Sequence, residues 1–210
     1  ITDSLDLTAG ARFFQIKQVV DALGDGPLNG GATVNVDRRS NEKGVNPKAS
    51  LSYKVTPDNL LFVSAAKGFR PGGPNRYRIN PTLCAADLTR LGITGAPDSY
   101  ESDSLWSYEL GTKNQFADGR VTLNTALFMT DWKKIQQQIA LMSCGFAYND
   151  NAGTAKVKGV EVEAAFKLAQ GFDLGGNATY TDAKIKTAAA GTSAQNGDEV
   201  LNVPKWRSEE

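Results

Sequence analysis

Short turns and long polar connections alternate along this 210-residue chain, and segments of alternating apolar and polar residues lie between them. The tight-turn signals are Thr56-Pro57-Asp58-Asn59, Ala117-Asp118-Gly119 and Ala169-Gln170-Gly171, and the long connections are 21–45, 71–103, 142–151 and 186–203. A soluble sandwich has no reason to place all its tight turns at one end. A membrane β-barrel does, because short turns join its strands on one side of the bilayer and long loops on the other. The alternation therefore predicts an antiparallel sheet that spans a membrane.

Composition agrees with this interpretation. Hydrophobic residues make up 40% of the chain, and 23 basic side chains balance 23 acidic ones. Barrel strands alternate lipid-facing and lumen-facing residues, so each strand averages to near-neutral hydropathy. The zero net charge gives no reason to expect a nucleic-acid partner. Helical periodicity is scarce, and the best helical stretch, 83–91, falls within a long connection.

Seven segments read as strands with period-2 alternation, and an eighth begins near Trp206. In 48–55, for example, Ala49, Leu51, Tyr53 and Val55 alternate with lysine and serine. The fold class that we predict is all-β, an antiparallel meander of about seven to eight strands paired in chain order, with tight turns near Pro57, Asp118 and Gln170 at one rim. The expected strands are 5–13, 48–55, 60–70, 104–116, 120–139, 156–166 and 172–185.

Aromatic residues on the apolar faces fall into two groups. One lies near the short turns (Tyr53, Phe116, Phe166, Phe172, and Phe62 if its strand turns that way), and the other near the long connections (Phe13, Trp106, Tyr108, Tyr180). Aromatic rings are common in any strand. Two bands separated by the length of a membrane-spanning strand, however, are typical of the interfacial girdles of a membrane barrel.

The polar faces carry no recognisable catalytic arrangement. The chain has no histidine, which excludes histidine-based triads and histidine-rich metal sites. We expect Glu109, Glu161 and Glu163 to form charge pairs with Lys113, Lys48 and Arg120 along a polar lumen wall. No catalytic residue, metal ligand or cofactor is predicted. The mixed segment 133–138 is expected to extend beyond the membrane as a two-stranded ribbon.

Four segments resemble the barrel of TonB-dependent outer-membrane receptors and occur in the same order. They are 58–75 with its Gly-Phe-Arg-Pro-Gly-Gly run, 100–113, 123–136 with Phe-Met-Thr-Asp-Trp, and 151–163. The resemblance implies a monomeric barrel in the outer membrane of a Gram-negative bacterium, in contact with outer-membrane lipid. It also implies import of a scarce ligand, most readily a ferric siderophore, driven by the TonB complex.

Transporters of this kind have about 22 strands around a plugged lumen. We therefore expect residues 1–210 to be a partial receptor barrel, with the plug, the TonB box and the terminal strands outside this sequence and coupling to TonB through N-terminal parts. A passive porin, a barrel-borne adhesin, or a TonB-dependent receptor for a carbohydrate or an aromatic compound are the alternatives.

Both cysteines, Cys84 and Cys144, fall in expected extracellular loops. Thiols outside the cytoplasm are oxidised, so we predict a disulfide between them. Ligand recognition is expected at the extracellular end, where loops and the upper wall meet an incoming molecule. Arginine offers planar donors to anionic groups, and aromatic rings offer stacking faces. The predicted ligand-binding residues are Arg70, Asn75, Arg76, Tyr77, Trp132 and Gln136.

Overall fold

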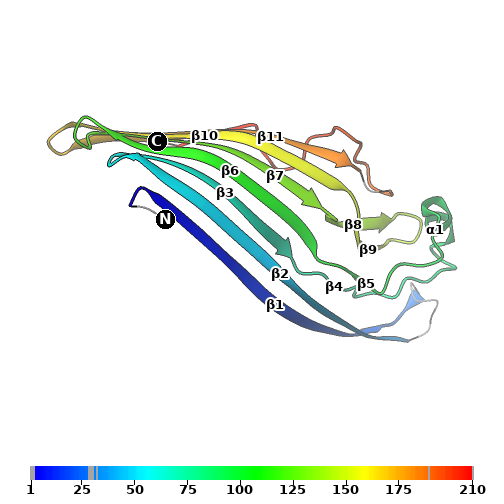
Figure 1. Ribbon diagram of the computed structural model, residues 1–210. Coiled ribbons are helices and arrows are strands. Elements are labelled where there is room, and N and C mark those ends of the chain that lie inside the picture. The colour runs from blue at the N-terminus through cyan, green and yellow to red at the C-terminus, as the bar shows by residue number, and fades with distance from the viewer. Residues whose placement is uncertain (1–2, 28–30, 32, 189, 210) are drawn as a thin grey trace.

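A computed structural model describes residues 3–27, 31, 33–188 and 190–209. It shows one curved antiparallel sheet of eight strands that pair in chain order and do not close into a barrel (Figure 1). This confirms the predicted fold class and strand order. The strands of this sheet are β1 (Leu5–Gly24), β2 (Val34–Thr56), β3 (Asn59–Arg70), β6 (Asp103–Phe116), β7 (Val121–Lys133), β10 (Thr154–Ala169), β11 (Phe172–Thr187) and β12 (Trp206–Glu209).

Tight turns and long connections lie at opposite ends of the sheet, as predicted (Figure 1). The turns join β2 to β3, β6 to β7 and β10 to β11. The β3–β6 loop contains two short strands, β4 (Gly73–Pro74) and β5 (Ser99–Tyr100), and the helix α1 (Ala85–Leu91), inside the expected helical stretch. No helix in the described ranges is long and apolar enough to cross a membrane.

The expected connection 21–45 is wrong. β1 and β2 stay paired residue for residue from Leu5 and Tyr53 as far as Gly24 and Val34, as a two-stranded ribbon that continues past the other strands. Outside the apolar part of the sheet, both faces of the ribbon mix apolar and polar residues, with Val19 and Leu23 on one face and Ile16, Val20 and Val36 on the other. The hydropathy alternation that reveals a strand is therefore absent there.

The expected single strand 120–139 is also wrong, because β7 ends at Lys133 and the next residue, Lys134, has a left-handed φ of 53°. The chain then forms a separate hairpin of β8 (Gln136–Leu141) and β9 (Phe146–Asn151). This is the expected two-stranded ribbon, and β9 occupies most of the expected connection 142–151. In the last long connection, β11 continues to Thr187, two residues beyond the expected end of the strand at 185.

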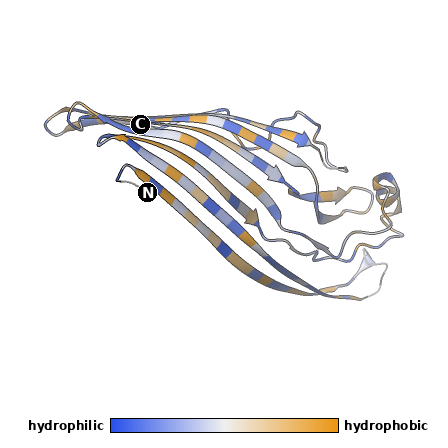
Figure 2. Cartoon of the chain, in the orientation of Figure 1, coloured by the Kyte–Doolittle hydropathy of each residue, from blue (hydrophilic) through white to orange (hydrophobic). Residues whose placement is uncertain are grey.

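The two faces of the sheet differ as the alternation requires (Figure 2). One row of directly paired residues is apolar on all eight strands: Leu7, Leu51, Val63, Leu110, Leu127, Val160, Tyr180 and Trp206. We call the face that carries this row the outer face and the opposite face the polar face. Of the aromatic residues of the outer face, Phe13 is 77% exposed and Phe172 is 58% exposed. Such exposure of apolar rings suits a lipid environment and not water.

Phe62 lies on the polar face and so does not belong to the aromatic band of the outer face. It is paired with Gly111, and a β-carbon built on Gly111 would lie 2.6 Å from the Phe62 ring. The same arrangement recurs where Phe128 lies over Gly159 and Phe14 over Gly44. Phenylalanine that covers a cross-strand glycine supplies packing that the glycine lacks.

The expected ladder of charge pairs on the polar face is wrong. In the part of the chain that the structure describes, none of the ion pairs involves Glu109, Glu161 or Glu163. Glu163 instead accepts a hydrogen bond of 3.0 Å from Asn124, and the Lys113 ammonium lies 5.9 Å from the centre of the Phe62 ring. An amide thus takes the place of a cation beside Glu163, and an aromatic ring the place of a carboxylate beside Lys113.

Candidate ligand-recognition site at the loop end

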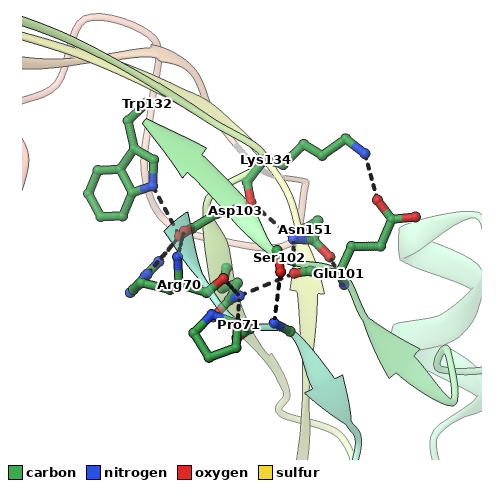
Figure 3. Close-up of polar contacts among 10 residues, drawn as sticks. Arg70, Pro71, Glu101, Ser102, Asp103, Trp132, Lys134 and Asn151 are labelled. Carbon is green, nitrogen blue, oxygen red and sulfur yellow. Dashed lines mark hydrogen bonds and ion pairs between the residues drawn. The ribbon is translucent and has the colours of Figure 1, made fainter. Parts of the chain in front are cut away.

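Two of the predicted residues, Arg70 and Trp132, meet at the fully buried carboxylate of Asp103 (Figure 3). Arg70 ends β3, Asp103 begins β6 and Trp132 is the last residue but one of β7. Asp103 accepts hydrogen bonds from the backbone nitrogen (2.9 Å) and Nε (2.7 Å) of Arg70 and from the indole Nε1 of Trp132 (3.0 Å). The Arg70 guanidinium also lies 4.8 Å from the centre of the Trp132 ring. The cluster ties three strand ends together, and nothing in the local sequence around Asp103 indicates it.

Gln136 and Asn151 connect the base of the β3–β6 loop to the β8–β9 hairpin. The Gln136 side-chain nitrogen donates to the carbonyl oxygens of Arg70 (3.2 Å), Pro71 (2.9 Å) and Glu101 (3.1 Å). Asn151 accepts from the backbone nitrogen of Glu101 at 2.5 Å, and Lys134 forms an ion pair with the Glu101 carboxylate at 2.5 Å (Figure 3). The amide donor of Gln136 is therefore occupied by backbone carbonyls at the base of the loop, and Asn151 also donates to the Glu101 carbonyl oxygen at 2.8 Å.

Asn75 is buried, with 3% of its surface exposed, and all of its side-chain polar atoms have partners. Its amide nitrogen donates to the carbonyl oxygens of Pro97 (2.9 Å) and Asn149 (2.8 Å), and its oxygen accepts from the Asn149 backbone nitrogen (2.8 Å). Arg38 on β2 donates to the Asn75 carbonyl oxygen (2.8 Å) and forms an ion pair with Asp98 (2.7 Å). Asn75 thus holds the two loops to each other and, through Arg38, to the sheet.

Glu42 on β2 is a further anchor that sequence reasoning missed. Its carboxylate accepts hydrogen bonds from the backbone nitrogens of Gly72 (2.8 Å) and Ser102 (2.6 Å) and from the Ser102 hydroxyl (2.6 Å). Gly72 is required here, because a β-carbon would overlap the carbonyl oxygen of Tyr100. The only sequence signal is that Glu42 continues the even-numbered polar set of β2.

The β3–β6 loop and the β8–β9 hairpin share a small apolar core beyond the sheet, made of Ile79, Cys84, Leu88, Ile139, Leu141 and Tyr148. Cys84 and Cys144 are joined by a disulfide across this core, with their Cα atoms 5.1 Å apart. Asp87 on α1 accepts a 2.6 Å hydrogen bond from the Ser143 backbone nitrogen. Hydrogen bonds from Ser143, ahead of the Arg90 guanidinium, lower the pKa of Asp87 to about 2. Because the folded pKa is lowered, this contact is at full strength above the usual pKa of an aspartate and weakens as the pH falls toward 2.

The disulfide predicts that neither Cys84 nor Cys144 is alkylated in the oxidised full-length protein under denaturing conditions. Mass spectrometry should recover Cys84 and Cys144 in one linked peptide pair, and reduction before alkylation should label both. Labelling of either cysteine without reduction would contradict the bridge. The disulfide restricts the freedom of the loop that it closes. With both cysteines replaced by serine, this restriction is lost, and we expect protease cleavage between residues 84 and 144 to become at least tenfold faster.

The two remaining predicted residues, Arg76 and Tyr77, line a pocket together with Arg78. The floor is apolar and comes from the far end of the β1–β2 ribbon (Ala22, Leu23, Val34, Val36) and from Phe146 on β9, with Asp25 at the edge. All three residues from 76 to 78 are exposed. Within the described ranges neither the Arg76 nor the Arg78 guanidinium forms an ion pair with the protein. We call this the arginine pocket. It offers two free guanidinium groups and a phenol ring above an apolar surface.

A family model described as "TonB dependent receptor-like, beta-barrel" matches residues 1–208. The chain belongs to the TonB-dependent receptor family. Members of this family are outer-membrane proteins of Gram-negative bacteria, so the loop end of this receptor barrel is extracellular and its polar face is the lumen face.

Relatives in sequence and structure agree with the family. The chain is 31% identical over 179 residues to the pesticin receptor of Yersinia enterocolitica, covering 84% of this chain and 24% of the relative. It is 24% identical to the metal-pseudopaline receptor CntO of Pseudomonas aeruginosa, and the match covers 93% of this chain and 24% of the relative. The ferric yersiniabactin uptake receptor FyuA of Yersinia pestis superimposes with a TM-score of 0.77 at 25% identity, covering 99% of this chain and 28% of that one. The chain thus spans about a quarter of the length of these relatives.

The relatives are transport receptors and not enzymes. No cluster of three or more metal-ligating side chains lies among the residues that the structure describes.

Proposed function

We propose that the full-length receptor takes up a ferric siderophore across the outer membrane by TonB-dependent transport. This chain would supply part of the barrel wall and two extracellular loops. Two relatives support the proposal by name, since they are receptors for metal-pseudopaline and ferric yersiniabactin. Coupling to TonB would run through parts of the receptor outside this sequence.

The observation that carries the proposal is the chemistry of the arginine pocket. Free guanidinium groups at Arg76 and Arg78 suit the negatively charged oxygens of an iron chelate, and Tyr77 suits its aromatic groups. Both arginines sit on a loop that contacts with Glu42, Arg38 and Asn75 hold in place. A ligand would therefore meet a preorganised surface, which reduces the entropy lost on binding.

The other predicted residues have a different role in this proposal. Arg70, Asn75, Trp132 and Gln136 would act as positioning residues, because their polar groups already bind within the protein. Each of them joins the wall or the hairpin to the loop that carries the pocket. Their replacement should reduce ligand affinity only as far as it loosens this loop.

Binding to the full-length receptor would test the pocket. With Arg76 and Arg78 both replaced by alanine, we expect the affinity for the cognate ferric siderophore to fall about 10- to 100-fold, because two charge-assisted hydrogen-bonding groups are lost. Arg120→Ala is the matched control, since Arg120 lies at the tight turn between β6 and β7, at the opposite rim. Equal affinity of the double variant and the native receptor, in a correctly assembled barrel, would exclude the pocket.

Uptake in cells separates the proposed function from its alternatives. A TonB-dependent siderophore receptor should support growth on its ferric ligand under iron limitation and lose that support when TonB is inactivated. Uptake through a passive porin would not change when TonB is inactivated. A receptor for a carbohydrate or an aromatic compound would show TonB-dependent uptake of that compound and no ferric siderophore binding.

A further inference from the structure

The outer face of the β1–β2 ribbon changes from apolar to cationic within one row of paired residues. Phe13 and Val45 form the last apolar row, with 77% and 40% of their surfaces exposed. The next three rows toward the extracellular end pair Gln15 with Lys43, Lys17 with Asn41, and Val19 with Arg39. All six residues share the face of Leu7 and Leu51, because every second residue of a strand points the same way.

Lys17 is the centre of this group. On the neighbouring strand its direct partner is Asn41, and its two diagonal neighbours are Lys43 and Arg39. Diagonal neighbours in an antiparallel pair lie about 7 to 8 Å apart, within reach of long side chains. Three cations thus share one patch, which ends at the row where Asp21 faces Asp37.

Two other lysines on the outer face have an acidic partner, and the two lysines of the patch have none. On β10 and β11, Lys156 pairs with Asp131 (3.1 Å) and Lys184 with Asp182 (3.8 Å). Arg39 makes a contact of 3.5 Å with Asp37, and both side chains are exposed. In the described part of the chain no carboxylate forms an ion pair with Lys17 or Lys43. Uncompensated like charges side by side are destabilising, so an external anion would be favoured here.

We propose that Lys17, Lys43 and Arg39 bind the phosphate groups of an anionic, phosphate-bearing lipid of the outer leaflet, whose acyl chains lie against Phe13 and Val45. The position fits because the patch begins where the apolar outer face ends, at the level of lipid headgroups. Long cationic side chains place their stems on apolar surface and their charges at the interface. Each lysine or arginine near an anionic membrane surface contributes measurably to lipid attraction. This inference rests on the family's outer-membrane location and is independent of the ligand taken up.

Other cations also lie on the outer face toward the extracellular end of its apolar surface. Cations next to apolar surface favour a lipid as the ligand over a free anion. On β3, Lys67 lies two residues closer to the extracellular end than Ala65. On β10, Lys158 lies two residues closer to that end than Val160, and both lysines are on the outer face. A free phosphate would use only the charged groups. A lipid would use the cations and the exposed apolar surface immediately below them.

Native mass spectrometry of the full-length receptor in detergent, with purified diphosphoryl lipid A as the probe, would test the patch. For Lys17→Gln/Lys43→Gln we expect lipid A binding at least tenfold weaker than for the native receptor. Lys17→Arg/Lys43→Arg should bind as the native receptor does, because the charge is retained. Lys48→Gln/Lys54→Gln is the matched control, since these lysines of β2 lie on the opposite, lumen face and should leave lipid A binding unchanged.

Two further measurements distinguish the possible sources of the anion. Monophosphoryl lipid A should bind more weakly than the diphosphoryl form, and inorganic phosphate at millimolar concentration should not displace either. Undiminished lipid A binding by Lys17→Gln/Lys43→Gln, or an equal loss in the lumen-face control, would overturn the proposal. Displacement by inorganic phosphate would also overturn it, because the patch would then bind a free anion and not a lipid. Siderophore affinity of the same variants should stay native, so a failed lipid result leaves the proposed uptake function unaffected.

Discussion

Replacing Gly159 with alanine is expected to prevent most of the full-length receptor from assembling into a folded barrel. Gly159 lies on the lumen face of β10, directly opposite Phe128 on β7. An added β-carbon would overlap both the Phe128 ring and the carbonyl oxygen of Tyr180 on β11. The ring could rotate away, but the carbonyl belongs to the strand ladder and cannot move without breaking the pairing of β10 with β11. Overpacking at such a site costs about 3 kcal/mol, the upper part of the usual range.

The fraction of receptor that migrates as a folded barrel in unheated gel samples measures this effect, and we expect it to fall below about one tenth of the native value. Gly10→Ala is the matched control. Gly10 is also a strand glycine of the lumen face, on β1, but a β-carbon there has no atom within 4 Å. Gly159→Ala/Phe128→Ala should recover only part of the loss, because the clash with the Tyr180 carbonyl remains. Normal assembly of Gly159→Ala would show that β10 and β11 lie farther apart than described here.

Replacing Asp103 with alanine is expected to destabilise the loop end of the receptor by about 3 kcal/mol, the cost of removing one partner from a buried, hydrogen-bonded ion pair. The change leaves three donors without their acceptor: the backbone nitrogen and guanidinium of Arg70 and the indole nitrogen of Trp132. Arg70 can regain water, since 48% of its side chain is exposed, and this limits the loss. The unfolding free energy of the full-length receptor in urea would measure the effect.

Asp98→Ala provides the comparison for this variant. Asp98 also pairs with an arginine, Arg38, at 2.7 Å, but 82% of its side chain is exposed. This control should have a small effect, about 1 kcal/mol or less, because Asp98 is exposed and the mostly buried Arg38 keeps its hydrogen bonds to the carbonyl oxygens of Asn75 and Tyr77. Asp103→Asn should be intermediate, because it keeps an acceptor for Trp132 and loses the charge that Arg70 requires. Equal effects of Asp98→Ala and Asp103→Ala would mean that burial of Asp103 adds nothing to the stability of the strand ends.

The sequence by itself determined the membrane-spanning part of the sheet. Period-2 alternation and tight-turn residues are local signals. A strand between lipid and a polar lumen must alternate apolar and polar residues, and short turns join such strands at one rim. For this reason the strands around Leu51, Leu110 and Val162, the three tight turns and the short helix near Leu88 could all be predicted, as could the loop positions of the two cysteines.

Only the tertiary structure decided what happens beyond the apolar band. The β1–β2 ribbon continues where both of its faces mix apolar and polar residues. β7 ends at Lys133 because Lys134 adopts a left-handed conformation that no neighbouring residue signals. The bonds of Asn75 to Asn149 and of Gln136 to Pro71 join residues 74 and 65 positions apart. Four of the six predicted recognition residues, Arg70, Asn75, Trp132 and Gln136, therefore bind backbone groups or Asp103 within the protein. Which polar side chain stays free for a ligand depends on contacts that form only when distant segments meet, and the order of residues along the chain does not encode that in any local pattern.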